Sequence, residues 1–188
     1  VYKRQDEIRA GLDVAGPGND ETVLVVRQGP RVLSVDAWAS SDPRGEVVDA
    51  LRKYKDKGVT VGVDSVGIGY YMAQHLRDAG YEVVEINVGA KPYDKERFVN
   101  LKAELYWGLR ERFTEGEVCG EFDERMIAQL CGVRYTYDSR GRVMIEGKDA
   151  IRRRGGKSPD RAEAMMLAFS SSNALQWGPV DLKKEIIF

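Results

Sequence analysis

Apolar side chains gather in three runs near the start of the chain, and the residues between the runs favour turns. The runs are residues 8–14 (IRAGLDV), 22–27 (TVLVVR) and 31–38 (RVLSVDAW). A cluster of Gly, Pro, Asn and Asp follows the first run, and Gly29-Pro30 follows the second. This pattern predicts three strands joined by short turns, which form an antiparallel meander.

The middle of the chain changes to helical spacing. In residues 44–57 apolar side chains recur every three or four positions, and Gly58 is suited to end that helix. The short apolar run 60–64 predicts a buried strand, 68–79 a second helix, and 81–86 a further strand. Strands connected through helices pair in parallel, so we expect the strand at 60–64 to lie beside the first strand.

The rest of the chain predicts helices and one hairpin. The expected helices cover residues from about 94 to 113, 123–130 and 158–174, and a hairpin joins 134–137 to 142–145 before a basic loop. The fold class is therefore α/β: a mixed sheet with a three-strand antiparallel meander plus parallel strands, helices on both faces and an extra β-hairpin. We expect one domain at 8–174, followed by a tail at 175–188, because 188 residues suffice for one core.

The composition narrows the possible chemistry. The chain has a single histidine, His75, and two cysteines, Cys119 and Cys131, without metal-site spacing. A histidine-based triad or a zinc site is therefore disfavoured, and a bound metal would be held by carboxylates, which select hard ions. The net charge of −1 does not exclude a nucleic acid, because basic residues can gather on one face. No apolar run approaches the roughly 20 residues that span a bilayer.

Three aspartates stand where elements begin or end. Asp13 and Asp64 end the first strand and the strand at 60–64, and ligands bind outside the carboxyl ends of such strands. Asp160 follows Ser158-Pro159, in which serine is a good N-cap, and so falls in the first turn of the last helix. Each residue alone has an ordinary explanation as a turn former or as a partner of the helix dipole.

Together the three aspartates form a carboxylate cluster that can hold two Mg²⁺ or Mn²⁺ ions for phosphodiester hydrolysis. Asp20 is either a fourth acidic member or simply a turn residue, and Glu163, one helical turn after Asp160, ranks below it. The basic side chains that precede Asp160 are expected to bind DNA phosphates; they are Lys148, Arg152, Arg153, Arg154 and Lys157.

Four segments carry a resemblance to a known family: GLDVAGPGNDETV, VGVDSVGIG, NLKAELYWGL and KSPDRAEAMMLA. Together they resemble the C-terminal nuclease domain of large terminase subunits, the DNA-packaging motors of tailed bacteriophages. The resemblance implies an RNase H-like fold and endonucleolytic cleavage of concatemeric double-stranded DNA in the cytoplasm of the infected bacterium. It assigns the metal ligands to Asp13, Asp64 and Asp160, less securely to Asp20, and places the hairpin near the DNA.

The same resemblance implies partners, namely the N-terminal ATPase domain of the full-length protein, the portal and the small terminase subunit. It also implies that residues 1–7 are the end of the linker to that ATPase domain. The sequence contains no P-loop motif, so we expect this chain to cut DNA without ATPase activity.

Three other interpretations compete with this one. A Holliday-junction resolvase or transposase nuclease would share the fold and the chemistry. An actin-like ATPase would need a duplicated domain and a late glycine loop, for which 188 residues leave no room. A non-catalytic DNA-binding or interaction module would leave the three aspartates dispensable.

Overall fold

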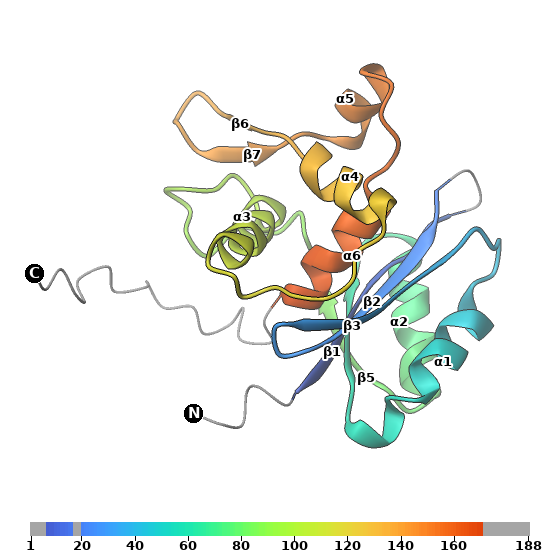
Figure 1. The fold of residues 1–188 in the computed structure, drawn as a ribbon. Coiled ribbons are helices and arrows are strands. Elements are labelled where there is room, and N and C mark those ends of the chain that lie inside the picture. Colours follow the sequence, from blue (N-terminus) through green and yellow to red (C-terminus); the bar gives the residue numbers. More distant parts are fainter. Residues whose placement is uncertain (1–6, 17–19, 171–188) are drawn as a thin grey trace, which may run out of the picture.

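A computed structural model describes residues 7–16 and 20–170 (Figure 1). Its centre is a five-stranded sheet in the order β3-β2-β1-β4-β5. The strands are β1 (Ile8–Asp13), β2 (Thr22–Gln28), β3 (Arg31–Trp38), β4 (Thr60–Asp64) and β5 (Glu82–Ile86). β2 is antiparallel to both β1 and β3, whereas β1, β4 and β5 run parallel. The predicted meander and its parallel extension are confirmed.

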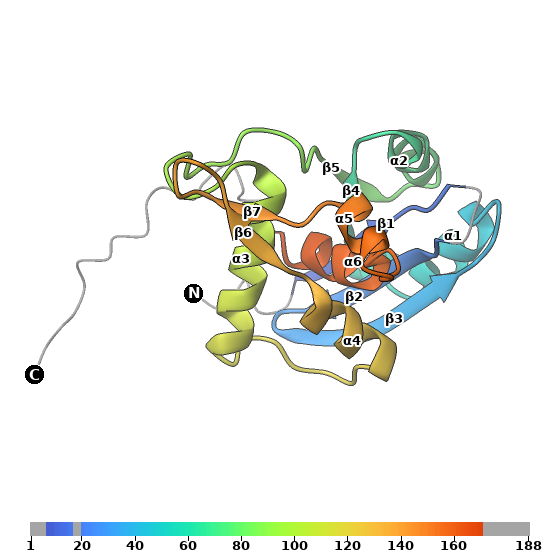
Figure 2. The same cartoon turned by 90° about the horizontal axis from the view of Figure 1, so that it is seen from above.

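Helices cover both faces of the sheet. They are α1 (Arg44–Arg52), α2 (Ile68–Asp78), α3 (Leu101–Thr114), α4 (Glu124–Gly132), α5 (Lys148–Arg153) and α6 (Asp160–Phe169). α1 and α2 lie on one face, while α6 lies on the other with α3 and α4 beside it (Figures 1 and 2). Successive residues of a strand pack against the helices on opposite faces of the sheet. Leu24 packs towards α1 and α2, and its neighbour Val25 packs towards α6.

α6 packs unusually close to the middle of the sheet, because the strand beneath it carries a glycine. A Cβ atom on Gly11 would lie 2.1 Å from the carbonyl oxygen of Ala164 and 2.1 Å from the backbone nitrogen of Ala168. Gly62 of β4 pairs with Gly11 of β1, and a Cβ atom added to Gly62 would lie 3.3 Å from the Leu167 oxygen. The lack of side chains at Gly11 and Gly62 therefore lets the backbone of α6 lie directly against β1 and β4.

Several predicted helices have different bounds in the structure, beginning with α1. α1 ends at Arg52, and a separate 3₁₀ turn, η2 (Lys55–Lys57), follows, because the buried side chain of Tyr54 turns the chain into the core below α1. Gly58 ends that turn in the left-handed conformation, with φ 70°, as its sequence position suggested.

The long helix expected from about residue 94 begins only at Leu101. The backbone before it pairs with the hairpin instead: Val99 donates to the Val143 oxygen at 3.0 Å, and Val143 donates to the Arg97 oxygen at 2.8 Å. Asn100 then caps α3, because its side chain accepts a hydrogen bond from the backbone nitrogen of Ala103.

The C-terminal third holds the expected hairpin, formed by β6 (Tyr135–Tyr137) and β7 (Val143–Ile145). The segment expected to be a basic loop contains a short helix, α5. The last helix begins at Asp160 rather than at residue 158 and ends at Phe169, and residues 171–174 of the prediction lie outside the described residues. Within 7–16 and 20–170, no helix is long and apolar enough to cross a membrane.

Candidate metal centre

Asp13 and Asp64 end two neighbouring parallel strands. Leu12 of β1 pairs with Val63 of β4, so the residues that follow each of them lie at the same level of the sheet. Both aspartates are half-buried. Asp64 accepts a hydrogen bond through Oδ1 from the Val66 backbone nitrogen at 3.2 Å. The structure therefore places these two carboxylates on one edge of the sheet, as the strand order predicted.

Asp160 is the first residue of α6 and is buried, with 5% of its surface exposed. Its Oδ2 accepts a hydrogen bond from the backbone nitrogen of Glu21 at 3.0 Å. Glu21 lies in the β1–β2 connection that begins after Asp13, so this bond ties the start of α6 to the same end of β1. The structure thus brings the third predicted aspartate to the edge of the sheet that carries the other two.

Ion pairs hold the residues around this bond in place. Arg125 of α4 lies 2.6 Å from Glu21 Oε1, and Arg161 Nε lies 3.5 Å from Glu21 Oε2. Arg161 also pairs with Asp123, which caps α4 through the Met126 nitrogen. This network connects the β1–β2 turn with α4 and α6, so the position of Asp160 depends on three elements.

The expected N-cap of the last helix is wrong. Ser158 does not cap α6: Pro159 stands at the cap position, and the buried Ser158 hydroxyl has no hydrogen-bond partner. The amide oxygen of Gln129, from α4, instead accepts hydrogen bonds from the backbone nitrogens of Arg161 at 2.7 Å and Ala162 at 3.3 Å. A neighbouring helix therefore satisfies the donors that the start of α6 leaves free. Sequence reasoning missed Gln129, because nothing in its local pattern marks it.

Glu163 lies one turn into α6 and is more central than its sequence position suggested. Its side chain is 8% exposed, and its Oε1 lies 2.6 Å from the ammonium nitrogen of Lys102 on α3. Sequence reasoning gave Lys102 no role, although it lies in the NLKAELYW motif. The available signal was its spacing of four residues from Tyr106, which places both side chains on one face of the helix.

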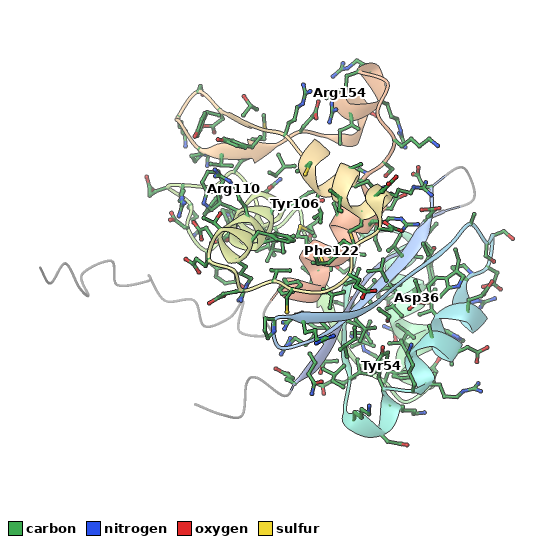
Figure 3. All side chains as sticks on the ribbon, viewed as in Figure 1. Asp36, Tyr54, Tyr106, Arg110, Phe122 and Arg154 are labelled. Carbon is green, nitrogen blue, oxygen red and sulfur yellow. The ribbon has the colours of Figure 1, made fainter. Side chains whose placement is uncertain are left out.

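The hydroxyl of Tyr106 on α3 is a buried polar atom within range of the charges of nearby carboxylates. The residue is 7% exposed, and its hydroxyl oxygen is buried without a hydrogen-bond partner. Burial raises the pKa of Tyr106 well above its usual value, and the negative charges of Glu163, Asp13 and Asp160 raise it further. Figure 3 shows Tyr106 where α3 faces α6. Three acidic side chains, one from β1 and two from α6, therefore affect the pKa of this one buried hydroxyl.

Burial also raises the pKa of Asp64, and the negative charge of Glu163 adds to the increase, while the hydrogen bond from Val66 opposes it. A folded-state pKa above the unfolded value means that the group favours folding only at low pH. This contribution is lost as the pH rises through the folded-state pKa. At neutral pH the ionised Asp64 therefore reduces the stability of the metal-free protein.

We expect the Asp64→Asn variant to unfold at a higher temperature than the wild type at neutral pH in a chelating buffer. The amide keeps the size of the side chain and removes the buried charge. The advantage should shrink as the pH falls towards 4, about the usual pKa of an aspartate, because the wild-type carboxyl is then protonated. Thermal unfolding across this pH range measures the difference, and a wild type that is more stable at neutral pH would contradict the assignment.

The basic side chains of residues 148–157 are of two kinds, those exposed to solvent and those engaged by the protein itself. Arg152, 57% exposed, pairs with Asp20 at 3.6 Å, and Arg153 and Lys157 are exposed. Arg154 is instead engaged by the protein itself at the surface, since it pairs with Glu146 and its Nη2 donates to the Gly132 oxygen at 2.8 Å (Figure 3). The side chain of Lys148 lies outside the described part of the structure.

The donor set suits a hard divalent cation, because Asp13, Asp64, Asp160 and Glu163 offer only carboxylate oxygens. The orphaned Tyr106 hydroxyl beside them also fits a site that binds a polar group. Within the described residues, however, no three potential ligands converge closely enough to enclose an ion. Protein donors hold the oxygens of Asp160 and Glu163 in this arrangement.

Solved structures with the same architecture identify the fold. The nuclease domain of the large terminase subunit gp2 of the bacterial virus Sf6, with manganese and β-thujaplicinol, superimposes with a TM-score of 0.77. It is 16% identical, and the match covers 89% of each chain. The chain has the fold of a phage large-terminase nuclease. The RNase H-like fold implied by the resemblance is confirmed.

A second structure with the terminase-nuclease fold comes from a thermophilic phage. The large terminase nuclease of phage G20c with bound magnesium has a TM-score of 0.66 and 18% identity, over 90% of this chain and 84% of that chain. The same nuclease has also been solved with bound cobalt. The sequence matches no protein-family model and no curated protein. At this identity the structural likeness shows the fold alone.

Proposed function

We propose that this chain is the nuclease domain of a phage large terminase subunit, a metal-dependent endonuclease that cuts concatemeric double-stranded DNA during genome packaging in the infected host. One observation supports the proposal: Asp13 and Asp64 end neighbouring parallel strands, and the Asp160 carboxylate is hydrogen-bonded to the β1–β2 connection at the same end of the sheet. This arrangement occurs in a fold shared with terminase nucleases, among them structures with manganese and with magnesium.

We assign the metal ligands to Asp13, Asp64 and Asp160, with Mg²⁺ or Mn²⁺ as the ion. When bound, two such ions supply an activated water and stabilise the leaving oxygen in an in-line displacement. The chain itself holds the carboxylates in place. The start of α6 presents Asp160 at the positive end of the helix dipole, and the Glu21 backbone nitrogen orients it. Asp20 stays outside this set, because its carboxylate faces Arg152.

On the DNA side we assign phosphate binding to the exposed basic side chains around α5, Arg152, Arg153 and Lys157, with Lys148 as a further candidate. The N-terminal ATPase domain, the portal and the small terminase subunit are the partners that this function would require.

The direct test uses supercoiled plasmid. With Mn²⁺ or Mg²⁺ the chain should convert it to nicked and linear forms, and a chelator should prevent the conversion. A control for substitutions of the candidate ligands is Asp49→Asn, which removes a carboxylate outside the site. The Asp49 side chain is 68% exposed on α1 and is paired with Arg52. This variant should cut like the wild type. A folded chain that leaves the plasmid intact at millimolar Mn²⁺ would contradict the proposal.

The division of the basic segment gives a further prediction. Replacing Arg152 and Arg153 together by alanine should weaken DNA binding and reduce the slope of log affinity against log salt by about 2, since each phosphate contact contributes about 0.9. Arg154→Ala should lower the unfolding temperature and leave most of the slope, because its partners are Glu146 and Gly132. Fluorescence anisotropy at several salt concentrations measures the slope. An unchanged slope in the double variant would remove α5 from the DNA path.

A further inference from the structure

Lys102 of α3 places its ammonium group in a fixed position beside the carboxylate cluster, which consists of Asp13, Asp64, Asp160 and Glu163. The Lys102 ammonium nitrogen lies 2.6 Å from Glu163 Oε1, and the exposed fractions of the two side chains are 20% and 8%. An exposed lysine pair contributes little and moves freely, whereas this pair is largely shielded from water. Lys102 therefore neutralises a carboxylate that would otherwise lie buried and unpaired.

The backbone at the start of α3 restrains this lysine further. The backbone nitrogen of Leu101 donates to the Ala90 oxygen at 2.9 Å, and that of Lys102 donates to the Val88 oxygen at 2.8 Å. Both acceptors lie in the segment that follows β5, the strand next to β4. These hydrogen bonds fix the backbone of Lys102 at the end of the sheet that carries the candidate ligands, and the Lys102 side chain reaches Glu163 from there.

A second, independent observation concerns the hydroxyl of Tyr106, a buried polar atom on the same helix as Lys102. The hydroxyl oxygen of Tyr106, on a residue that is 7% exposed, has no hydrogen-bond partner. The Lys102 ammonium nitrogen lies 6.0 Å from the centre of the Tyr106 ring. A buried hydroxyl without a partner is costly. The negative charges of Glu163, Asp13 and Asp160 act on this hydroxyl, so it lies within their electrostatic range.

We propose that Lys102 is a tethered counter-cation that holds Glu163 away from the divalent metal and so sets how tightly the centre binds its ions. The inference rests on the proposed function, since it takes the neighbouring aspartates as metal ligands. A positive charge beside the cluster repels an incoming divalent ion, and Glu163 cannot offer to that ion the oxygen that Lys102 holds. Lys102 is on this account a positioning residue that acts through Glu163.

The test measures Mn²⁺ binding by the full chain, with free Mn²⁺ read from its electron paramagnetic resonance signal. Lys102→Met should lower the dissociation constant about tenfold or add one bound ion, because a charge is removed and Glu163 is released. Lys102→Arg keeps the charge and should retain the wild-type value. Adding Glu163→Gln to Lys102→Met should abolish the gain, because the released carboxylate is then absent.

Stability gives a second readout. Lys102→Met leaves Glu163 buried and unpaired, so its unfolding temperature in chelator should fall and added Mn²⁺ should raise it more than in the wild type. Should Lys102→Met not fold, the Glu163→Gln single variant decides. It leaves the Lys102 charge without its carboxylate, and Mn²⁺ binding should weaken about tenfold.

The inference is overturned if Lys102→Met binds Mn²⁺ no more tightly than the wild type, if the double variant keeps the gain, or if Glu163→Gln binds Mn²⁺ like the wild type. Plasmid cleavage by the wild type in the same buffer separates the two claims. A wild type that neither binds Mn²⁺ nor cuts overturns the proposed function. A wild type that does both, beside unaltered variants, overturns only the role of Lys102.

Discussion

Asp160→Asn is expected to reduce the rate of plasmid cleavage by about 10³-fold or more, in line with the loss of a central electrostatic group from an active site. Asp160 is 5% exposed and accepts the Glu21 backbone hydrogen bond through one oxygen. An asparagine retains that acceptor and the size of the side chain. The substitution therefore removes one negative charge from the centre and little else.

The measurement is the initial rate of nicking over a range of Mn²⁺ concentrations. Circular dichroism and the unfolding temperature in chelator should show that the variant retains its fold. Asp49→Asn, which changes an exposed aspartate of α1 in the same way, should keep the wild-type rate. A folded Asp160→Asn variant that cuts within about tenfold of the wild type would remove Asp160 from the catalytic residues.

Gly11→Ala is expected to prevent stable folding. The added Cβ would lie 2.1 Å from backbone atoms of α6, which cannot yield as a flexible side chain can. Overpacking a well-filled core usually costs about 1–3 kcal/mol, and a clash with a helix backbone should exceed about 4 kcal/mol. A domain near the lower end of the usual range of about 5–15 kcal/mol would then be partly or wholly unfolded.

The matched control is Gly108→Ala in the interior of α3, where an added Cβ meets nothing within 4 Å. That change should raise the stability by up to about 1 kcal/mol, since alanine favours a helix more than glycine does. Urea unfolding of both variants measures the difference. If Gly11→Ala were as stable as the wild type, α6 could not lie against β1 as the structure has it.

The sheet and the side-by-side placement of Asp13 and Asp64 could be predicted, because local periodicity and the rule for parallel connections determine them. The start of α3 could not, since the pairing of Val99 with Val143 is a contact between distant segments that overrides a helical pattern. The Lys102–Glu163 pair spans 61 positions, and the cap that Gln129 gives to Arg161 spans 32. Such contacts leave no periodic trace in the sequence.

The buried charges of the candidate metal centre lower the stability of the fold, and specific partners of these charges reduce the loss. The ionised Asp64 carboxylate disfavours the metal-free fold at neutral pH. Lys102 neutralises Glu163, and the Glu21 backbone nitrogen binds Asp160. This arrangement is expected of a functional site, in which groups are placed for their chemistry rather than for stability.

The most direct test of the central claim is a crystal of the chain soaked in Mn²⁺, with data collected to show the anomalous signal of manganese. We expect anomalous peaks within ligand distance of the carboxylates of Asp13, Asp64 and Asp160. Peaks at other acidic residues alone, such as Asp49, or no peak at the edge of β1 and β4 in a crystal that carries Mn²⁺ elsewhere, would contradict it.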